Sequence, residues 1–143
     1  LANNQTHIYL CGPLLLMNSV RKAWEANPFE NTHLHFETFG ASGLFAPLNF
    51  TVKIPRFNKE FVVGENQTLL QVLEEENLDI MYDCKKGECG LCQVDILEYT
   101  GDIDHRDLFF SEEEKGKNNK LCACVSRVAN GYIVIDTAYR SNI

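Results

Sequence analysis

The first 40 residues combine two short apolar stretches with one amphipathic stretch. Residues 7–11 (HIYLC) form an apolar run typical of a strand, and residues 32–39 (THLHFETF) alternate in polarity as a second strand does. Between them, residues 13–27 predict a helix with Pro13 in its first turn, where proline is tolerated. The pattern predicts a strand–helix–strand unit that is too small to bury the faces of its own strands.

The pattern after residue 48 begins with a pair of strands and a helix. Residues 48–55 (LNFTVKIP) and 59–66 (KEFVVGEN) are strand-like segments separated by PRFN, which reads as a turn. Residues 69–77 (LLQVLEEEN) predict a helix, because Thr68 and Gln71 form a capping-box pattern immediately before its apolar residues.

The remainder of the chain adds further strands and a second helix. Residues 94–99 (VDILEY) and 132–137 (YIVIDT) have the composition of strands, and Ser111 with Glu114 forms a second capping box ahead of a short helix. A hairpin, a crossing helix and returning strands predict an α+β domain of the β-grasp type.

A composition change separates these two parts of the chain. The stretch GASGLFAPL is rich in small residues and carries Pro47, as linkers often do. We therefore expect a first domain over residues 1–40, a linker over 41–48 and a second domain over 49–143.

Four cysteines carry the strongest chemical signal. Cys84, Cys89 and Cys92 follow the spacing C-x4-C-x2-C, and Cys124 follows after a gap of 31 residues. This is the ligand spacing of a plant-type 2Fe–2S cluster. Glycines inside the loop allow the chain to wrap closely around a cluster and to turn its N–H groups toward sulfur.

Two alternatives remain open from the spacing. A structural zinc module is one, although zinc modules usually use C-x2-C pairs or one such pair with histidines. The identity of the fourth ligand is the other. Cys122 and Cys124 are two residues apart, so on an extended segment both side chains point the same way, and either could reach the site.

Residues 49–139 resemble the ferredoxin domain of reductases of the phthalate dioxygenase reductase type. The resemblance rests on GDIDHRDLFFSEEEKGK and on CVSRVANGYIVID. It implies a β-grasp fold and a ligand role for Cys124, the cysteine immediately before the V-S-R stretch. The interval between the two cluster segments is a few residues longer here, so we expect residues 115–119 to bulge.

The N-terminal part resembles the end of the nicotinamide-binding domain of the same reductases, which makes it a remnant of an α/β domain. The matching segments are CGPLLLMNSV and HFETF. The resemblance implies that Cys11, Gly12 and Pro13 lie near a nicotinamide ring. It also implies that Glu37 and Phe39 lie where flavin and nicotinamide meet. No G-x-G-x-x-G phosphate loop and no flavin-barrel segment are found in the sequence.

Composition limits the function further. A formal net charge of −7 argues against nucleic acid as a partner. No apolar run has the length of a membrane span, and thiolate–iron chemistry implies a reducing compartment, hence the cytoplasm. The chain opens on Leu1, so we expect it to be part of a longer protein.

The family resemblance implies a role in electron transfer. In such reductases, hydride from NAD(P)H enters FMN, and a 2Fe–2S cluster then passes single electrons to a Rieske-type oxygenase component. The chain would be the ferredoxin end of such an enzyme and would not itself be catalytic. A stand-alone ferredoxin carrier is the alternative.

Four further residues have simpler interpretations. His33 and His35 alternate on a strand and should face one side, without a third ligand that would favour metal binding. His105 is expected to hydrogen-bond within its own loop. Arg127 is expected either to donate to a carboxylate or to cover the core.

Overall fold

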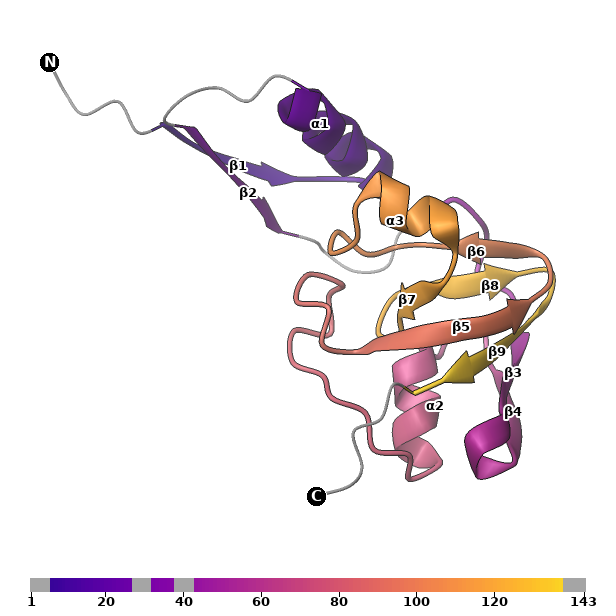
Figure 1. The fold of residues 1–143 in the computed structure, drawn as a ribbon. Coiled ribbons are helices and arrows are strands. Elements are labelled where there is room, and N and C mark those ends of the chain that lie inside the picture. The colour runs from indigo at the N-terminus through magenta and orange to yellow at the C-terminus, as the bar shows by residue number, and fades with distance from the viewer. Residues whose placement is uncertain (1–5, 27–31, 38–42, 138–143) are drawn as a thin grey trace, which may run out of the picture. The chain divides into compact units, whose positions relative to one another are not determined.

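The chain divides into two compact units, Leu1–Ser42 and Gly43–Ile143. The computed structural model describes residues 6–26, 32–37 and 43–137, and Figure 1 gives the element labels. The boundary between the units falls inside the segment predicted as a linker, residues 41–48. Residues 43–48 group with the second unit, so a separate linker stays a prediction.

The first unit is a strand–helix–strand motif, as predicted. Strand β1 (Thr6–Cys11) is followed by helix α1 (Leu14–Ala26) and strand β2 (Thr32–Glu37). The two strands pair in parallel over their whole length, so that Cys11 lies opposite Glu37. Met17 of α1 is fully buried. Parallel strands joined by a helix are the repeating unit of α/β domains, in agreement with the predicted fold class.

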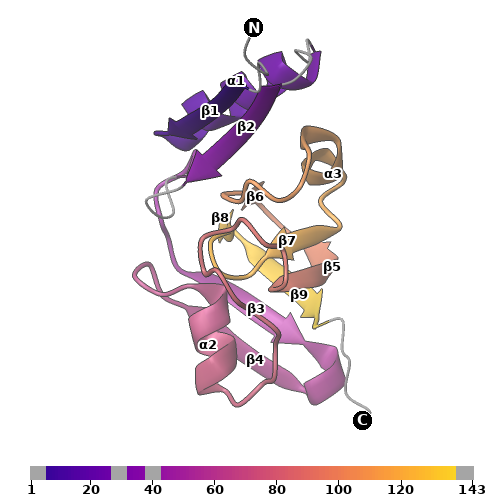
Figure 2. The ribbon, with the colours of Figure 1, turned by 90° about the vertical axis from the view of Figure 1, so that its left-hand side faces the viewer.

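The second unit is built on a five-stranded mixed sheet with the order β4-β3-β9-β5-β7. Strand β3 pairs antiparallel with β4 and parallel with β9, while β5 pairs antiparallel with both β9 and β7. Helix α2 lies across one face of this sheet (Figure 2). The bounds are β3 Phe50–Ile54, β4 Lys59–Val63, α2 Leu69–Glu75, β5 Gln93–Tyr99, β7 Lys120–Cys122 and β9 Tyr132–Asp136. The predicted β-grasp arrangement is therefore confirmed.

Three short strands and one turn of helix were not predicted. Strands β6 (Asp102–Asp104) and β8 (Arg127–Ala129) form a separate two-stranded sheet, and β7 is equally short. The turn PRFN contains the 3₁₀ helix η1 (Pro55–Phe57). A strand of three residues is too short to display an alternating pattern, so it cannot be recognised from polarity alone.

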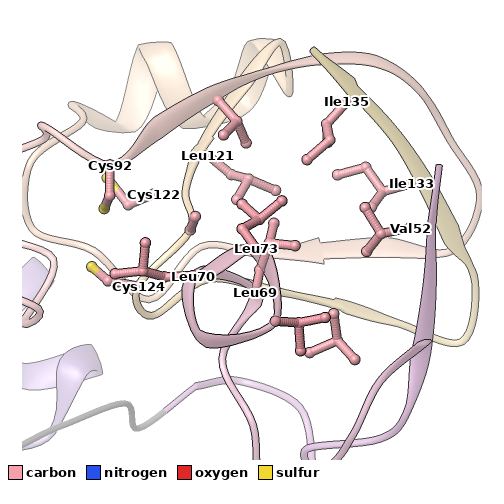
Figure 3. Packing of buried hydrophobic residues seen from close by; sticks show 14 of the residues in the cluster. Val52, Leu69, Leu70, Leu73, Cys92, Leu121, Cys122, Cys124, Ile133 and Ile135 are labelled. Atoms are coloured by element: carbon pink, nitrogen blue, oxygen red, sulfur yellow. The ribbon is translucent and has the colours of Figure 1, made fainter. Parts of the chain in front are cut away.

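The core lies between the sheet and α2. Alternate residues of β3 (Phe50, Val52 and Ile54) point into it, and Ile133 and Ile135 do so from β9. Four residues of α2 complete it, namely Leu69, Leu70, Val72 and Leu73. Figure 3 shows Cys92, Cys122 and Cys124 at one edge of this cluster, away from Ile133 and Ile135. The cysteine site is thus attached directly to the core.

Both predicted capping boxes are present. The Thr68 hydroxyl accepts a hydrogen bond from the Gln71 N–H at 3.1 Å, and the Gln71 side chain accepts one from the Thr68 N–H at 2.8 Å. Ser111 and Glu114 make the same exchange at the start of α3 (Glu112–Lys117). Residues 115–119 are not simply a loop, because α3 continues to Lys117 and ends on Asn118 in the left-handed conformation; the bulge relative to the family stays a prediction.

Arg127 binds the backbone of two segments of the second unit, the one before β3 and the turn before α2. Its guanidinium donates hydrogen bonds to the carbonyl oxygens of Gln67, Leu48 and Gly64, and it lies over the Phe50 ring. The side chain is almost fully buried. The expected alternatives, a carboxylate partner or simple coverage of the core, therefore miss the main role of this residue, which is to bind carbonyl groups ahead of β3 and α2.

We predict that Arg127→Lys destabilises the second unit although it preserves the charge. A lysine ammonium cannot reach three carbonyl groups with the planar geometry of a guanidinium, and each buried acceptor left unpaired costs about 1–3 kcal/mol. Urea unfolding followed by circular dichroism measures the loss. Lys53→Ala is the control, since the Lys53 side chain is half-exposed and its ion pair is with the exposed Glu60. Equal midpoints for the two variants would contradict this role.

Candidate metal centre

The loop between α2 and β5 wraps around the sulfur of Cys84. The backbone N–H groups of Lys86, Glu88 and Cys89 each donate to the Cys84 sulfur at 3.4 Å. Burial raises the pKa of this thiol, but the three donors outweigh it and hold the pKa below its ordinary value. Donors that converge on one sulfur are what a thiolate ligand requires.

Glycine is required at two positions of this loop. Gly87 has a φ of +76° and Gly90 a φ of +72°. A Cβ atom on Gly87 would lie 2.7 Å from a methyl carbon of Val125 and 2.9 Å from the Cα of Asp107. A Cβ atom on Gly90 would lie 2.4 Å from the ring of Phe109. Both backbone conformation and space therefore exclude a side chain, as expected for a loop that wraps closely.

The four predicted ligands come from three local structures. Cys84 and Cys89 lie in the loop and are partly exposed, whereas Cys92 is buried at the residue before β5. Cys124 is buried in the turn after β7. The expectation that Cys122 and Cys124 point the same way on an extended segment is wrong. The chain turns after Cys122, whose carbonyl accepts hydrogen bonds from the N–H groups of Val125 and Ser126.

The sulfur of Cys92 contacts both candidates for the fourth position. Hydrogen bonds from the thiols of Cys122 and Cys124, together with the Cys124 N–H, lower the pKa of Cys92 to about 3. The same hydrogen bonds and burial raise the pKa of the two donor thiols. Contact with Cys92 thus does not distinguish Cys122 from Cys124.

The surroundings of Cys122 and Cys124 differ in other respects. The N–H of Gly87 donates to the Cys124 sulfur, and the charge of Cys84 also acts on Cys124. The charges that act on Cys122 are those of Asp107, Cys92 and Cys124, and its side chain is fully buried in the core cluster. Cys124 is therefore the residue that faces the Cys84 loop.

The cysteines are grouped around two points. Cys84 contacts Cys89, and Cys92 contacts Cys122 and Cys124. In the described part of the chain, no three His, Cys, Asp or Glu side chains are placed to hold one metal ion together. A structural zinc ion takes four ligands around a single point, whereas the two irons of a 2Fe–2S cluster share four cysteines. The grouping and the thiolate donor set fit a 2Fe–2S cluster better than a zinc ion.

The predicted nicotinamide-region residues lie at the carboxyl end of the first unit's strands. Cys11 and Glu37 face each other across β1 and β2. Both line a cavity of about 150 Å³ together with Tyr9, Leu10 and His35. Gly12 and Pro13 follow at the end of β1, where the Pro13 carbonyl accepts from the Met17 N–H. Phe39 lies outside the described residues.

The structure adds a histidine that the sequence pattern does not associate with the others. His7 stacks on both His33 and His35, and its Nδ1 lies 2.9 Å from Nε2 of His35. The prediction that His33 and His35 share a face holds, but only the β1–β2 register brings His7 beside them. His105 hydrogen-bonds through Nε2 to Asn118 at 2.9 Å, beyond its own loop, while its Nδ1 lies 3.8 Å from the Asp107 carboxylate within the expected loop.

Asp107 and Ser126 are a second pair that sequence reasoning missed. Both are buried beside the cysteine loop, and the Ser126 hydroxyl donates to the Asp107 carboxylate at 3.2 Å. In the sequence, Asp107 is one of three aspartates in the polar segment DIDHRD, and nothing in the pattern separates it from the other two. Only its burial, which the pattern does not reveal, distinguishes it from a surface residue.

Several reductases are similar to this chain. The carnitine monooxygenase reductase subunit of Escherichia coli (strain K12) is 38% identical over 132 residues, which is 92% of this chain and 40% of that protein. Phthalate dioxygenase reductase of Burkholderia cepacia is 35% identical over 132 residues, 91% of this chain and 39% of that protein. The chain thus spans about two fifths of the length of these relatives.

A solved structure supports the same relationship. The structure described as phthalate dioxygenase reductase, a modular structure for electron transfer from pyridine nucleotides to [2Fe-2S], matches with a TM-score of 0.65 and 32% sequence identity. The match covers 95% of this chain and 41% of that one. The resemblance stated from the sequence is therefore confirmed across both units.

A family model matches the part of the chain that carries the cysteines. Residues 52–129 match the model described as the 2Fe-2S iron-sulfur cluster binding domain, and this segment includes all four predicted ligands. It covers more than half of the chain. The chain belongs to the family of 2Fe-2S iron-sulfur cluster binding domains.

Proposed function

We propose that Cys84, Cys89, Cys92 and Cys124 are the four cluster ligands. Three observations support this set. Backbone N–H groups converge on Cys84, Cys89 contacts Cys84, and Cys92 contacts Cys124. Cys124 is favoured over Cys122 because it accepts from the Gly87 N–H inside the loop. Cys122 then serves as a small apolar core residue.

The protein's own groups tune the site. When bound, a 2Fe–2S cluster exchanges one electron at a time. The N–H groups of Lys86, Glu88 and Cys89 donate to the Cys84 sulfur. They would stabilise the additional negative charge of a reduced cluster and so raise its reduction potential. Cys84 and Cys89 are partly exposed, while Cys92 and Cys124 are buried. The loop side of the site is therefore where a partner can approach most closely.

We propose further that the chain is the ferredoxin end of an FMN-dependent NAD(P)H reductase that supplies single electrons to a Rieske-type oxygenase component. The single observation that carries this proposal is the joint match of both units to reductases of oxygenase systems. A stand-alone carrier would leave the strand–helix–strand unit, with Cys11 opposite Glu37, without a role. We place the protein in the cytoplasm, because cysteine thiolates persist in a reducing compartment.

The direction of electron flow follows from the potentials of the two cluster types. The reduction potential of a plant-type cluster is about −400 mV, and the reduction potentials of Rieske centres start at about −150 mV. Each difference of about 59 mV changes the equilibrium constant of a one-electron transfer tenfold, so this gap corresponds to an equilibrium constant of about four powers of ten. Electron transfer toward a Rieske centre is therefore strongly favoured.

The structure describes no helix with the length and apolar composition needed to cross a membrane.

The first prediction of this proposal concerns the cofactor. Prepared without oxygen, the chain should be reddish-brown and contain about two irons and two acid-labile sulfides, as a 2Fe–2S cluster requires. Metal analysis and a visible absorption spectrum measure this directly. A colourless protein that contains one zinc per chain would contradict the redox proposal.

A second prediction separates the two candidates for the fourth ligand. Cys124→Ser should lose the cluster or hold it only weakly, because a thiolate is replaced by a hydroxyl that is a poor iron ligand. Cys122→Ser should retain the visible spectrum and lose about 1 kcal/mol or somewhat more of stability through packing. Iron content and the unfolding midpoint of each variant are the measurements. The opposite result would assign the ligand role to Cys122.

A third prediction concerns electron delivery. The chain, reduced chemically, should pass single electrons to the Rieske centre of a purified oxygenase, and stopped-flow absorbance would follow the transfer. The rate should fall as salt is added, because charged loop residues such as Lys85, Lys86 and Glu88 steer the encounter. Lys53→Glu is the matched control for Lys85→Glu, because the Lys53 side chain on β3 is half-exposed, as the Lys85 side chain is. A rate that is independent of both salt and Lys85 would exclude steering by this loop.

A further inference from the structure

A buried carboxylate lies directly behind the cysteine loop. Asp107 has no exposed surface, and its two carboxylate oxygens have different partners. One oxygen accepts from the Ser126 hydroxyl at 3.2 Å, and the other accepts from the Phe110 N–H at 2.9 Å. Lys115, also buried, donates from its ammonium to the Asp107 carbonyl at 2.6 Å. We refer to Asp107, Ser126 and Lys115 as the Asp107 clamp.

The Asp107 clamp joins the two segments that carry the cysteines. Ser126 is two residues after Cys124, and its hydroxyl also accepts from the Arg106 N–H at 3.1 Å. The next residue after Asp107, Leu108, donates its N–H to the Gly87 carbonyl at 2.9 Å. The Asp107 carboxylate therefore holds the Cys124 turn through Ser126, and the N–H of the next residue, Leu108, holds the Cys84–Cys92 loop.

The carboxylate is charged, and its field reaches the cysteine site. Burial raises the pKa of Asp107, but His105, Lys115 and the Phe110 N–H outweigh it and hold the pKa below its ordinary value. Asp107 also packs directly against the cysteine loop, since a Cβ atom on Gly87 would lie 2.9 Å from the Cα and 3.2 Å from the Cβ of Asp107. A buried charge acts through a medium of low dielectric and is only weakly screened by salt.

We propose that Asp107 is a positioning residue of the cluster site and that its buried negative charge lowers the reduction potential. This inference rests on the proposed function of the chain as a cluster-based electron carrier. The clamp fixes the Cys124 turn against the cysteine loop through Ser126 and Leu108. A fixed negative charge makes the addition of an electron less favourable, and it opposes the N–H donors around Cys84.

The test is Asp107→Asn in the cluster-loaded 143-residue chain. Asparagine keeps the shape of the side chain and can still accept from the Phe110 N–H, but it carries no charge. Spectroelectrochemical titration should show a more positive midpoint potential than that of the parent chain. We expect at least about a tenfold change in the reduction equilibrium, or about 59 mV for a one-electron couple. The shift should persist in high salt.

Two variants of the same clamp separate charge from positioning. Lys115→Gln removes a buried positive charge, so it should shift the potential in the negative direction. Ser126→Ala changes no charge but removes the hydroxyl bridge, so the cluster should be lost faster to a chelator, with the potential nearly unchanged. Asp104→Asn is the control, because this buried carboxylate is held by Arg106 and by the Leu44 N–H.

The outcomes distinguish this inference from the proposed function. A parent chain without a reversible one-electron transition would contradict the function itself. A parent chain with such a transition, and an Asp107→Asn variant with an unchanged potential, would overturn only the role of Asp107. If Asp107→Asn fails to assemble the cluster, the Lys115→Gln variant decides: a negative shift supports the inference, and no shift overturns it.

Discussion

The position of Gly87 is the constraint on which the cysteine site depends. Its N–H donates to the Cys124 sulfur and its carbonyl accepts from Leu108, so both of its backbone groups join separate segments. A side chain there would collide with Val125 and with the backbone of Asp107, and the positive φ would be strained as well. Three segments far apart in sequence can therefore meet only because this residue has no side chain.

The sheet and α2 also hold these segments together. Antiparallel pairing of β5 with β7 sets Gln93 opposite Cys122, and the Ala123 N–H donates to the Cys92 carbonyl at 3.0 Å. The Leu70 N–H, in the first turn of α2, donates to the Ala123 carbonyl at 2.9 Å. The turn that carries Cys124 is thus fixed from both sides, and the core residues of α2 are packed beside it.

The sequence alone predicted the elements that have a local signal. The spacing of Cys84, Cys89 and Cys92 indicates its chemistry directly, and both capping boxes mark helix starts through residues three apart. The three-residue strands and the turn after Cys122 have no such signal, because non-local pairing forms them. For the same reason the meeting of His7 with His35, and of Asp107 with Ser126, could not be predicted. The choice of the fourth ligand depends on the turn after Cys122. An extended strand, which was assumed from the sequence, would place the side chains of Cys122 and Cys124 on the same side, and the turn does not.

The buried ions of the second unit are difficult to explain as stabilising contacts. Asp104, Arg106, Asp107 and Lys115 are all nearly inaccessible to water; Arg106 pairs with the Asp104 carboxylate, and Lys115 donates to the Asp107 carbonyl. Transferring an ion from water into the protein interior costs several kcal/mol. Replacing a buried ion pair by apolar residues of similar volume often leaves the stability unchanged or increases it. These four residues extend from the end of β6, at Asp104, to Lys115 of α3, and the loop between the two elements contacts Gly87 through Leu108. Directional hydrogen bonds fix the relative position of two segments more tightly than apolar contacts can, and a redox site needs its ligands held in one geometry before and after the electron arrives. Positioning of the cysteine segments therefore explains this buried charge better than stability does.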